Sequence, residues 1–107
     1  MATIHVDLPD DAVANITVGN KITDAGVVVY YCASRGLLYG AGKISILSKV
    51  ATAEVLHVSL GDDLGIDNPS TPMTADISGV NIRLNITVDD ASVDHVTFNY
   101  NKQIIKL

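Results

Sequence analysis

The chain has 107 residues, enough for one domain that buries roughly two-thirds of its unfolded surface. Seven lysines and arginines against twelve acidic residues give a net charge of −5, which excludes a basic stripe of the kind that follows nucleic-acid phosphates. Charged residues make up 18% of the chain, below the usual share of about 25%, so less surface than normal is suited to solvent. We therefore expect a partner that covers part of the surface.

Cys32 is the only cysteine, so neither an intrachain disulfide nor a cysteine-based zinc cluster is possible, which fits a reducing compartment. The first eight residues lack the basic and apolar regions of a signal peptide, and no run of 18 apolar residues predicts a membrane span. These features predict synthesis in the cytoplasm without a signal peptide, and no membrane partner.

The first predicted strand runs from Thr3 to Leu8, because apolar and polar residues alternate along it with a period of two. Ala12 to Val18 fits either a short helical turn or a strand. Its β-branched residues, and the Gly19-Asn20 turn that follows them, favour the strand. Asp24 to Gly26 predicts the next turn.

The segment from Val27 to Cys32 is apolar at every position, which is typical of a strand buried on both faces. The chain offers few helix candidates, so we expect a second sheet or another subunit to cover the second face. Leu37 to Leu47 predicts one strand bent by its glycines, with Lys43, Ser45 and Arg35 on its wet face.

The second half of the chain predicts a strand at Thr52 to Leu60, a long loop over residues 61–72, and then a β-hairpin. In this hairpin Met73 to Ile77 pairs with Val80 to Val88 across a tight Ser78-Gly79 turn, since glycine takes a positive φ at no steric cost. We expect Val96 to Tyr100 to add a third strand to the same apolar-faced sheet. Lys102 to Leu107 predicts a short last strand. One face of the best-specified strand carries apolar residues at every second position: Ile82, Leu84, Ile86 and Val88.

Seven or eight short strands at intervals of about ten residues, without a sustained helical period, indicate an antiparallel sandwich or barrel. We predict an all-β fold, an antiparallel β-sandwich of about seven to eight strands, in a single domain that spans residues 1–107.

The common enzyme signatures are absent from the sequence, which has no Gly-x-Ser-x-Gly elbow, no phosphate-cradling glycine loop and no Cys-x-x-Cys pair. His5, His57 and His95 lack the spacing of metal ligands and receive no site role. Cys32 lies in the most apolar predicted strand, where burial would make the thiol inert. We therefore expect no enzyme, no catalytic residue, no cofactor and no metal.

Two further groups of residues admit a functional and a structural interpretation. Calcium prefers oxygen ligands, but the acidic residues of the 61–72 loop fit no EF-hand spacing, and a solvated loop explains them. Aspartate pairs elsewhere fall in predicted turns, where the side chain bonds its own backbone. The tyrosines could stack on a sugar, although core and interface packing is the expected use. The loop residues are Asp62, Asp63, Asp67 and Asn68, the aspartate pairs are Asp10-Asp11 and Asp89-Asp90, and the tyrosines are Tyr30, Tyr31, Tyr39 and Tyr100.

Four segments occur in an order that resembles a class of small all-β domains in proteins of tailed-bacteriophage particles. They are Asp24-Ala25-Gly26-Val27, Ser34-Arg35-Gly36, Asp62-Asp63-Leu64-Gly65 and Thr74 to Leu84. In those domains a segment of the form a-I-S-G-x-x-I/V-x-L precedes a penultimate strand, and the closing strand ends near a tyrosine, as Phe98-Asn99-Tyr100 does here. The likeness covers about residues 24 to 100.

The resemblance implies a non-enzymatic structural protein of the virion, which we expect to be a capsid auxiliary or decoration protein that self-associates and docks on the shell. A tail-fibre or baseplate accessory protein and a carbohydrate-binding β-sandwich remain as alternatives. The expected partners are virion shell proteins and further copies of the chain, with a trimer favoured by the resemblance. The candidate interface residues are Val27, Val28, Tyr30, Leu37, Tyr39, Ile105 and Leu107.

Overall fold

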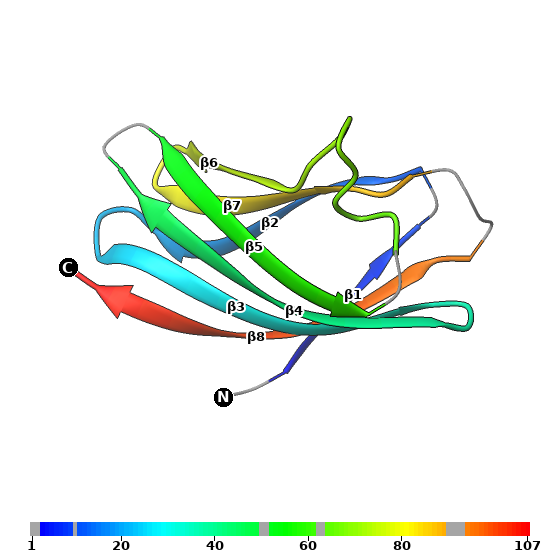
Figure 1. Ribbon diagram of the computed structural model, residues 1–107. Helices are drawn as coiled ribbons and strands as arrows, with labels where there is room; N and C mark the ends of the chain where they lie inside the picture. Colours follow the sequence, from blue (N-terminus) through cyan, green and yellow to red (C-terminus); the bar gives the residue numbers. More distant parts are fainter. Residues whose placement is uncertain (1–2, 10, 50–51, 62–63, 90–93) are drawn as a thin grey trace.

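The computed structural model describes residues 3–9, 11–49, 52–61, 64–89 and 94–107, which form eight β-strands in two antiparallel sheets packed as a sandwich (Figure 1). The larger sheet has the strand order β1-β8-β3-β4-β5, and the smaller sheet has the order β2-β7-β6. This confirms the predicted all-β sandwich. No helix long and apolar enough to cross a membrane occurs among the described residues. The strands are β1 (Ile4–Leu8), β2 (Val13–Asn20), β3 (Asp24–Arg35), β4 (Leu38–Ser48), β5 (Ala53–Gly61), β6 (Thr74–Ser78), β7 (Asn81–Thr87) and β8 (Val96–Lys106).

The predicted hairpin is confirmed, because β6 and β7 pair antiparallel and Gly79 turns between them with a φ of 62°. The alternating apolar residues of β7 are buried, with Ile82 and Ile86 at 0% exposure and Leu84 at 1%. The expectation of a third strand in this sheet is wrong. The third strand of the small sheet is β2, while the segment from Val96 lies between β1 and β3 in the large sheet.

Strand β8 also corrects the predicted ending of the chain, because Val96 to Lys106 is one strand of 11 residues rather than two short ones. It pairs with β1 along one side and with β3 along the other. Residues near its middle continue the pairing, with Asn101 opposite Tyr30 and Lys102 opposite Val29. The polar residues Asn101 and Lys102 therefore lie within one uninterrupted strand.

Strand β3 is buried on one face only, so the expectation of burial on both faces is wrong. Val27, Val29 and Tyr31 point into the sandwich and are at most 5% exposed, whereas Val28 is half-buried and Tyr30 and Cys32 are exposed. The strand is central in its sheet, but the small sheet covers only the inner face. Cys32 is thus an exposed thiol and not the buried one that the apolar run suggested.

The turn predicted at Asp24 lies at residues 21–23 instead, and Asp24 is the first residue of β3. Its buried carboxylate accepts hydrogen bonds from the Asn20 N–H (2.8 Å), the Thr23 hydroxyl (2.9 Å) and the Lys106 ammonium (3.2 Å). The Asn20 N–H is the main cause of the lowered pKa of Asp24, opposed by burial and assisted by Thr23 and Lys106. The carboxylate therefore fastens the β2–β3 turn to the end of β8.

Arg35, which was expected on a wet strand face, is 4% exposed at the end of β3. Its guanidinium donates to the Asp89 carboxylate at 2.5 Å and to the carbonyl oxygens of Asp89 (3.0 Å), Asp94 (3.1 Å) and Leu64 (3.3 Å). A buried cation requires such acceptors, because removing it from water is otherwise costly. Arg35 consequently ties the β5–β6 and β7–β8 connections to the end of the large sheet.

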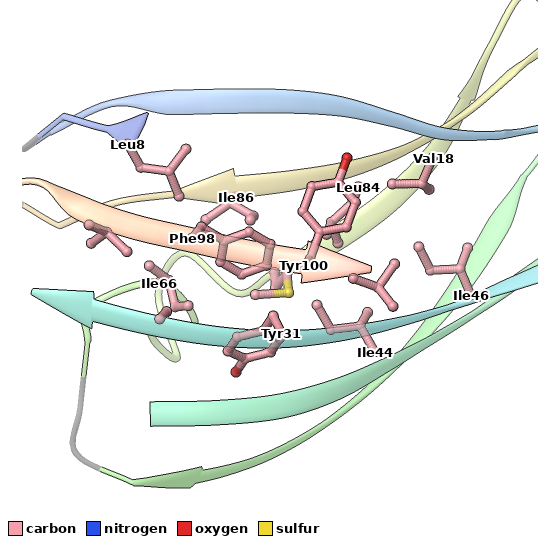
Figure 2. Close-up of a cluster of buried hydrophobic side chains, with 14 of the residues drawn as sticks. Leu8, Val18, Tyr31, Ile44, Ile46, Ile66, Leu84, Ile86, Phe98 and Tyr100 are labelled. Carbon is pink, nitrogen blue, oxygen red and sulfur yellow. The ribbon is translucent and has the colours of Figure 1, made fainter. Parts of the chain in front are cut away.

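The core lies between the two sheets, where aromatic rings form its centre (Figure 2). Phe98 stacks on Tyr31 with ring centroids 4.8 Å apart and packs against Tyr100 at 5.8 Å. β4 crosses this region in regular register with both neighbours, so its glycines do not form a bulge. Gly42 instead provides space, because a Cβ atom at this position would overlap the Tyr31 ring.

Candidate interaction surface

The outer face of the large sheet carries apolar side chains at positions where a free-standing sandwich normally presents polar ones. The strand register places Val28 opposite Ser45 on β4, and Ser45 opposite Leu56 on β5. Since facing residues of paired strands share one side of a sheet, these side chains lie in one row across three strands. The next rows along β5 contribute Val58 and Leu60 to the same face.

Six residues on this face form what we call the apolar patch, with members on β3, β4, β5 and β8. Three of them from β5 are strongly exposed, at 65% for Leu56, 61% for Val58 and 82% for Leu60. Scattered exposed apolar residues are normal, whereas several on one sheet face make that face a candidate interaction surface. The patch consists of Val28, Leu47, Leu56, Val58, Leu60 and Ile105.

Part of the apolar patch is hollowed into a shallow depression of about 280 Å³. Val28 and Ile105 line one side of it, and Leu47, Leu56 and Glu54 line the other. The open, mostly apolar hollow suits an inserted side chain from another protein, because such anchors fill apolar pockets at interface centres.

The candidate interface residues predicted from the sequence do not all meet on this surface. Val28 and Ile105 belong to the apolar patch, and Tyr30 lies on the same sheet face, opposite Lys43. Val27 is a correction, because it is 0% exposed and packs in the core.

The other three predicted residues lie at the ends of the sheet. Leu37 is 88% exposed in the turn between β3 and β4, and Tyr39 lies on the outer face near that turn. Leu107, 81% exposed, follows the opposite end of β8, where its N–H donates to the Thr23 carbonyl. The structure therefore supports one surface from this set, centred on the apolar patch.

Sequence reasoning missed Leu56, Val58 and Leu60, although the segment was correctly predicted as a strand. Both faces of β5 carry apolar residues: Leu56, Val58 and Leu60 lie on the outer face, and Val55 lies on the inner face and packs against the core. The signal that would have revealed them is the regular placement of three large apolar residues at every second position beside a single acidic one, Glu54.

A shared sugar-stacking platform is not formed by the tyrosines. Tyr31 and Tyr100 are buried, and the two exposed ones lie on different rows of the outer face. Tyr30 is opposite Lys43, whereas Tyr39 is four residues before Lys43 on β4. At about 3.3 Å per strand residue, the two exposed rings are roughly 13 Å apart along the sheet.

A second feature near this sheet is a hydrogen-bonded chain of three side chains. The Tyr31 hydroxyl is 2.6 Å from His57 Nε2, and His57 Nδ1 is 2.7 Å from the Asp67 carboxylate. A carboxylate only accepts, so Nδ1 donates to Asp67, and in the neutral imidazole Nε2 then accepts from the Tyr31 hydroxyl. Asp67 also accepts the Met73 N–H at 2.8 Å, and a hollow of about 270 Å³ adjoins the group.

Burial, together with the negative charge of Asp67, raises the pKa of Tyr31 to about 12. The phenol therefore stays protonated near neutral pH and is unsuited to act as a base or nucleophile. The arrangement instead connects the segment before β6 to β5 and β3 through His57.

The remaining polar residues singled out in the sequence take separate positions. His5 bonds Asn99, and His95 bonds Asp7, so the three histidines do not meet. Within the described ranges, no group of three or more potential metal-binding side chains occurs. Asn68 donates to Asp89. Asp10, Asp62, Asp63 and Asp90 lie outside the described residues.

Comparison with known proteins gives a fold likeness and no family. No protein-family model matches the chain, and no curated protein matches it. Among solved structures, the chain is similar to the crystal structure of the Acinetobacter phage vB_ApiP_P1 tailspike protein, with a TM-score of 0.57 and 8% sequence identity. The match covers 98% of this chain and 22% of the tailspike chain. This likeness shows a shared all-β architecture with one part of a phage tail protein.

Proposed function

We propose that this chain is a non-enzymatic structural protein of a tailed-bacteriophage particle, which docks on a larger component of the virion through the apolar patch. The observation that carries the proposal is the exposed apolar patch on the outer face of the large sheet. In the single chain, three of its side chains are more than 60% exposed.

The surroundings of the apolar patch support a docking role. Polar residues of β8, namely Asn99, Asn101 and Gln103, share the same outer face, and His5 and Asp7 of β1 continue it. An apolar centre with a polar margin is the usual composition of a protein–protein interface. The apolar centre excludes water, while the polar margin keeps the free chain soluble.

Two independent likenesses support the phage setting. The sequence resembles small all-β domains of tailed-phage particles, and the fold is similar to part of a phage tailspike protein. A tail-associated position and a capsid position both fit a small docking domain. The role of a capsid decoration protein rests on the sequence resemblance, whereas a tail-associated role has the additional support of the tailspike likeness.

A binding role is also favoured by the state of the Tyr31–His57–Asp67 chain. Its hydroxyl is protonated and its imidazole has both nitrogens occupied by hydrogen bonds. These groups stabilise the fold and offer no activated nucleophile to a substrate.

The first test is to purify the phage particles that encode this chain and to identify it in them by mass spectrometry. Its presence in stoichiometric amounts is the expected result. A chain that is found only in the lysate, and not in particles, would refute the proposal.

The second test uses particles that lack the chain, to which the purified protein is added before sedimentation. Leu47→Lys and Ile105→Lys place a charge in the apolar patch away from β5, and we expect both variants to lose co-sedimentation. Val13→Lys is the matched control, since Val13 is 68% exposed on β2, at the outer face of the small sheet. Docking that is unaffected by the patch variants would assign the interface to another surface.

A further inference from the structure

We infer that two copies of this chain pair through the free edge of β5, forming an antiparallel twofold dimer in which the two large sheets join into one. The occupant of this edge is therefore a second copy of the same chain. The inference concerns the edge of the sheet rather than its outer face, so it does not depend on docking to a phage particle.

The two sheets expose four edges, and β5 is the least protected of them. β1 and β6 have only five residues each, and β2 contains a register shift between Thr17 and Gly19. Short length, charges and bulges are the devices by which natural proteins prevent edge pairing. β5 has nine residues in regular register with β4 and carries one acidic residue, Glu54.

The backbone groups of β5 on the edge away from β4 are able to pair with another strand. Among the described residues, β5 makes backbone hydrogen bonds to β4 and to no other segment. On its inner face, His57 is held by Tyr31 and Asp67, so the strand is fixed in its extended form before a partner arrives. A preordered edge reduces the conformational entropy lost on association.

The sequence of β5 is also complementary to itself. Leu56, Val58 and Leu60 are symmetric about Val58, so an antiparallel copy with its twofold axis at Val58 places Leu56 opposite Leu60 and Val58 opposite Val58. All three pairs lie on the outer face, where cross-strand aliphatic contacts stabilise a sheet. A register that differs by one residue would set outer side chains against inner ones.

The same register keeps the two Glu54 side chains apart. Glu54 lies four residues from the axis, so the two Glu54 side chains are eight residues apart along the joined strands. At about 3.3 Å per residue this is roughly 26 Å, well beyond the screening length of about 8 Å in physiological salt. Glu54 is in addition paired with Lys49 at 2.6 Å.

The pairing has a clear stoichiometry. When a strand edge pairs with the same edge of a second copy, neither edge can bind a further chain, so the assembly is a closed dimer. The trimer implied by the sequence resemblance would need two different surfaces, and it remains an untested prediction. The joined sheet would also bring two apolar patches side by side on one continuous face.

The first experiment measures the mass of the purified chain by light scattering coupled to size-exclusion chromatography. We expect twice the 11.3 kDa of the single chain. Val58→Lys sets two ammonium groups against each other at the axis and should give the single-chain mass. Val13→Lys is the control with a comparably exposed residue, and it should remain a dimer. Thermal unfolding followed by circular dichroism verifies that both variants fold.

The second experiment tests the register by oxidative cross-linking in a Cys32→Ser background, which removes the exposed native thiol. Val58→Cys alone should form a disulfide-linked dimer, because residue 58 meets its own copy across the axis. Leu56→Cys alone should not, whereas Leu56→Cys combined with Leu60→Cys should. Residues 56 and 60 of one chain are roughly 13 Å apart, too far for an intrachain bridge.

A wild-type protein of single-chain mass at high concentration would overturn the inference. An oligomer that survives Val58→Lys, or that gives no cross-link at residue 58, would overturn it as well by assigning the contact to another surface. Either failure leaves the docking proposal intact, because that proposal is tested with Leu47 and Ile105 on other strands.

Discussion

Replacing Arg35 with methionine should be among the most destabilising single changes in this protein that leave the aromatic core untouched. Methionine is an unbranched side chain that can occupy a buried position but donates no hydrogen bond. The substitution removes the cation from the Asp89 carboxylate, whose side chain is 28% exposed, and removes a donor from the carbonyl oxygens of Leu64, Asp89 and Asp94.

The expected loss of unfolding free energy follows from the acceptors that lose their buried donor. Removing one partner of a buried ion pair typically costs about 3–5 kcal/mol, because the other partner stays partly desolvated. A domain of this size has a total unfolding free energy of about 5–15 kcal/mol, so Arg35→Met would remove a large part of it. With a urea m-value near 1.5 kcal/mol/M, the unfolding midpoint should fall by roughly 2 to 3 M.

The assay is urea unfolding followed by far-UV circular dichroism, since the chain contains no tryptophan. Lys49→Met is the matched control, because it breaks the exposed ion pair to Glu54, whose side chains are 51% and 63% exposed. Exposed pairs contribute about 0–1 kcal/mol, so its midpoint should shift by less than about 0.7 M. If Arg35→Met and Lys49→Met unfold at the same midpoint, the role assigned to Arg35 is wrong.

Three further changes test other parts of the structure. Leu84→Asp should abolish the folded circular dichroism spectrum, because it puts a lone charge in the core, whereas Arg83→Ala on the outer face should keep both the spectrum and a near-native urea midpoint. Gly42→Ala should lower stability by about 1–3 kcal/mol in the same urea assay, because the new methyl group overlaps the Tyr31 ring; an unchanged midpoint would mean that the ring moves freely. The lowered pKa of Asp24 contributes stability that is present above the unfolded pKa of 3.8 and is lost as the pH falls through the folded pKa. The difference in unfolding free energy between the wild type and Asp24→Asn should therefore shrink between about pH 6 and about pH 3. A constant difference across that range would contradict the assignment.

The period of the hydrophobic pattern was enough to predict the best-defined strands. From Ile82 in β7 to Val88 just after it, apolar and polar residues alternate strictly. A shift by one residue would expose every apolar side chain, so the sequence determines which face is buried. The pattern does not determine which strands are neighbours. Val96 to Tyr100 was therefore correctly assigned as strand but placed in the wrong sheet.

The candidate surface was predicted in part, for a related reason. Val28 and Ile105 were identified because the segments around them are apolar on both faces. The same property made it impossible to tell which face of β3 is covered, so Val27 was included and Cys32 was expected to be buried. Exposure depends on the second sheet, which covers one side of β3 and whose position no local pattern encodes.

The position of β8 between β1 and β3 has a consequence for how this protein folds. The first strand along the chain reaches the large sheet only through the last one, since β1 pairs with β8 and is separated from it by about ninety residues. Such contacts form only after a large loop has closed, so the chain loses conformational entropy before the contacts stabilise it. All-β domains of this topology therefore fold slowly, with folding times of about milliseconds to seconds. During synthesis, β3, β4 and β5 emerge early and can form a three-stranded sheet whose β3 edge stays open until β8 is made. Chaperone capture should therefore be greatest for nascent chains that end between β7 and β8.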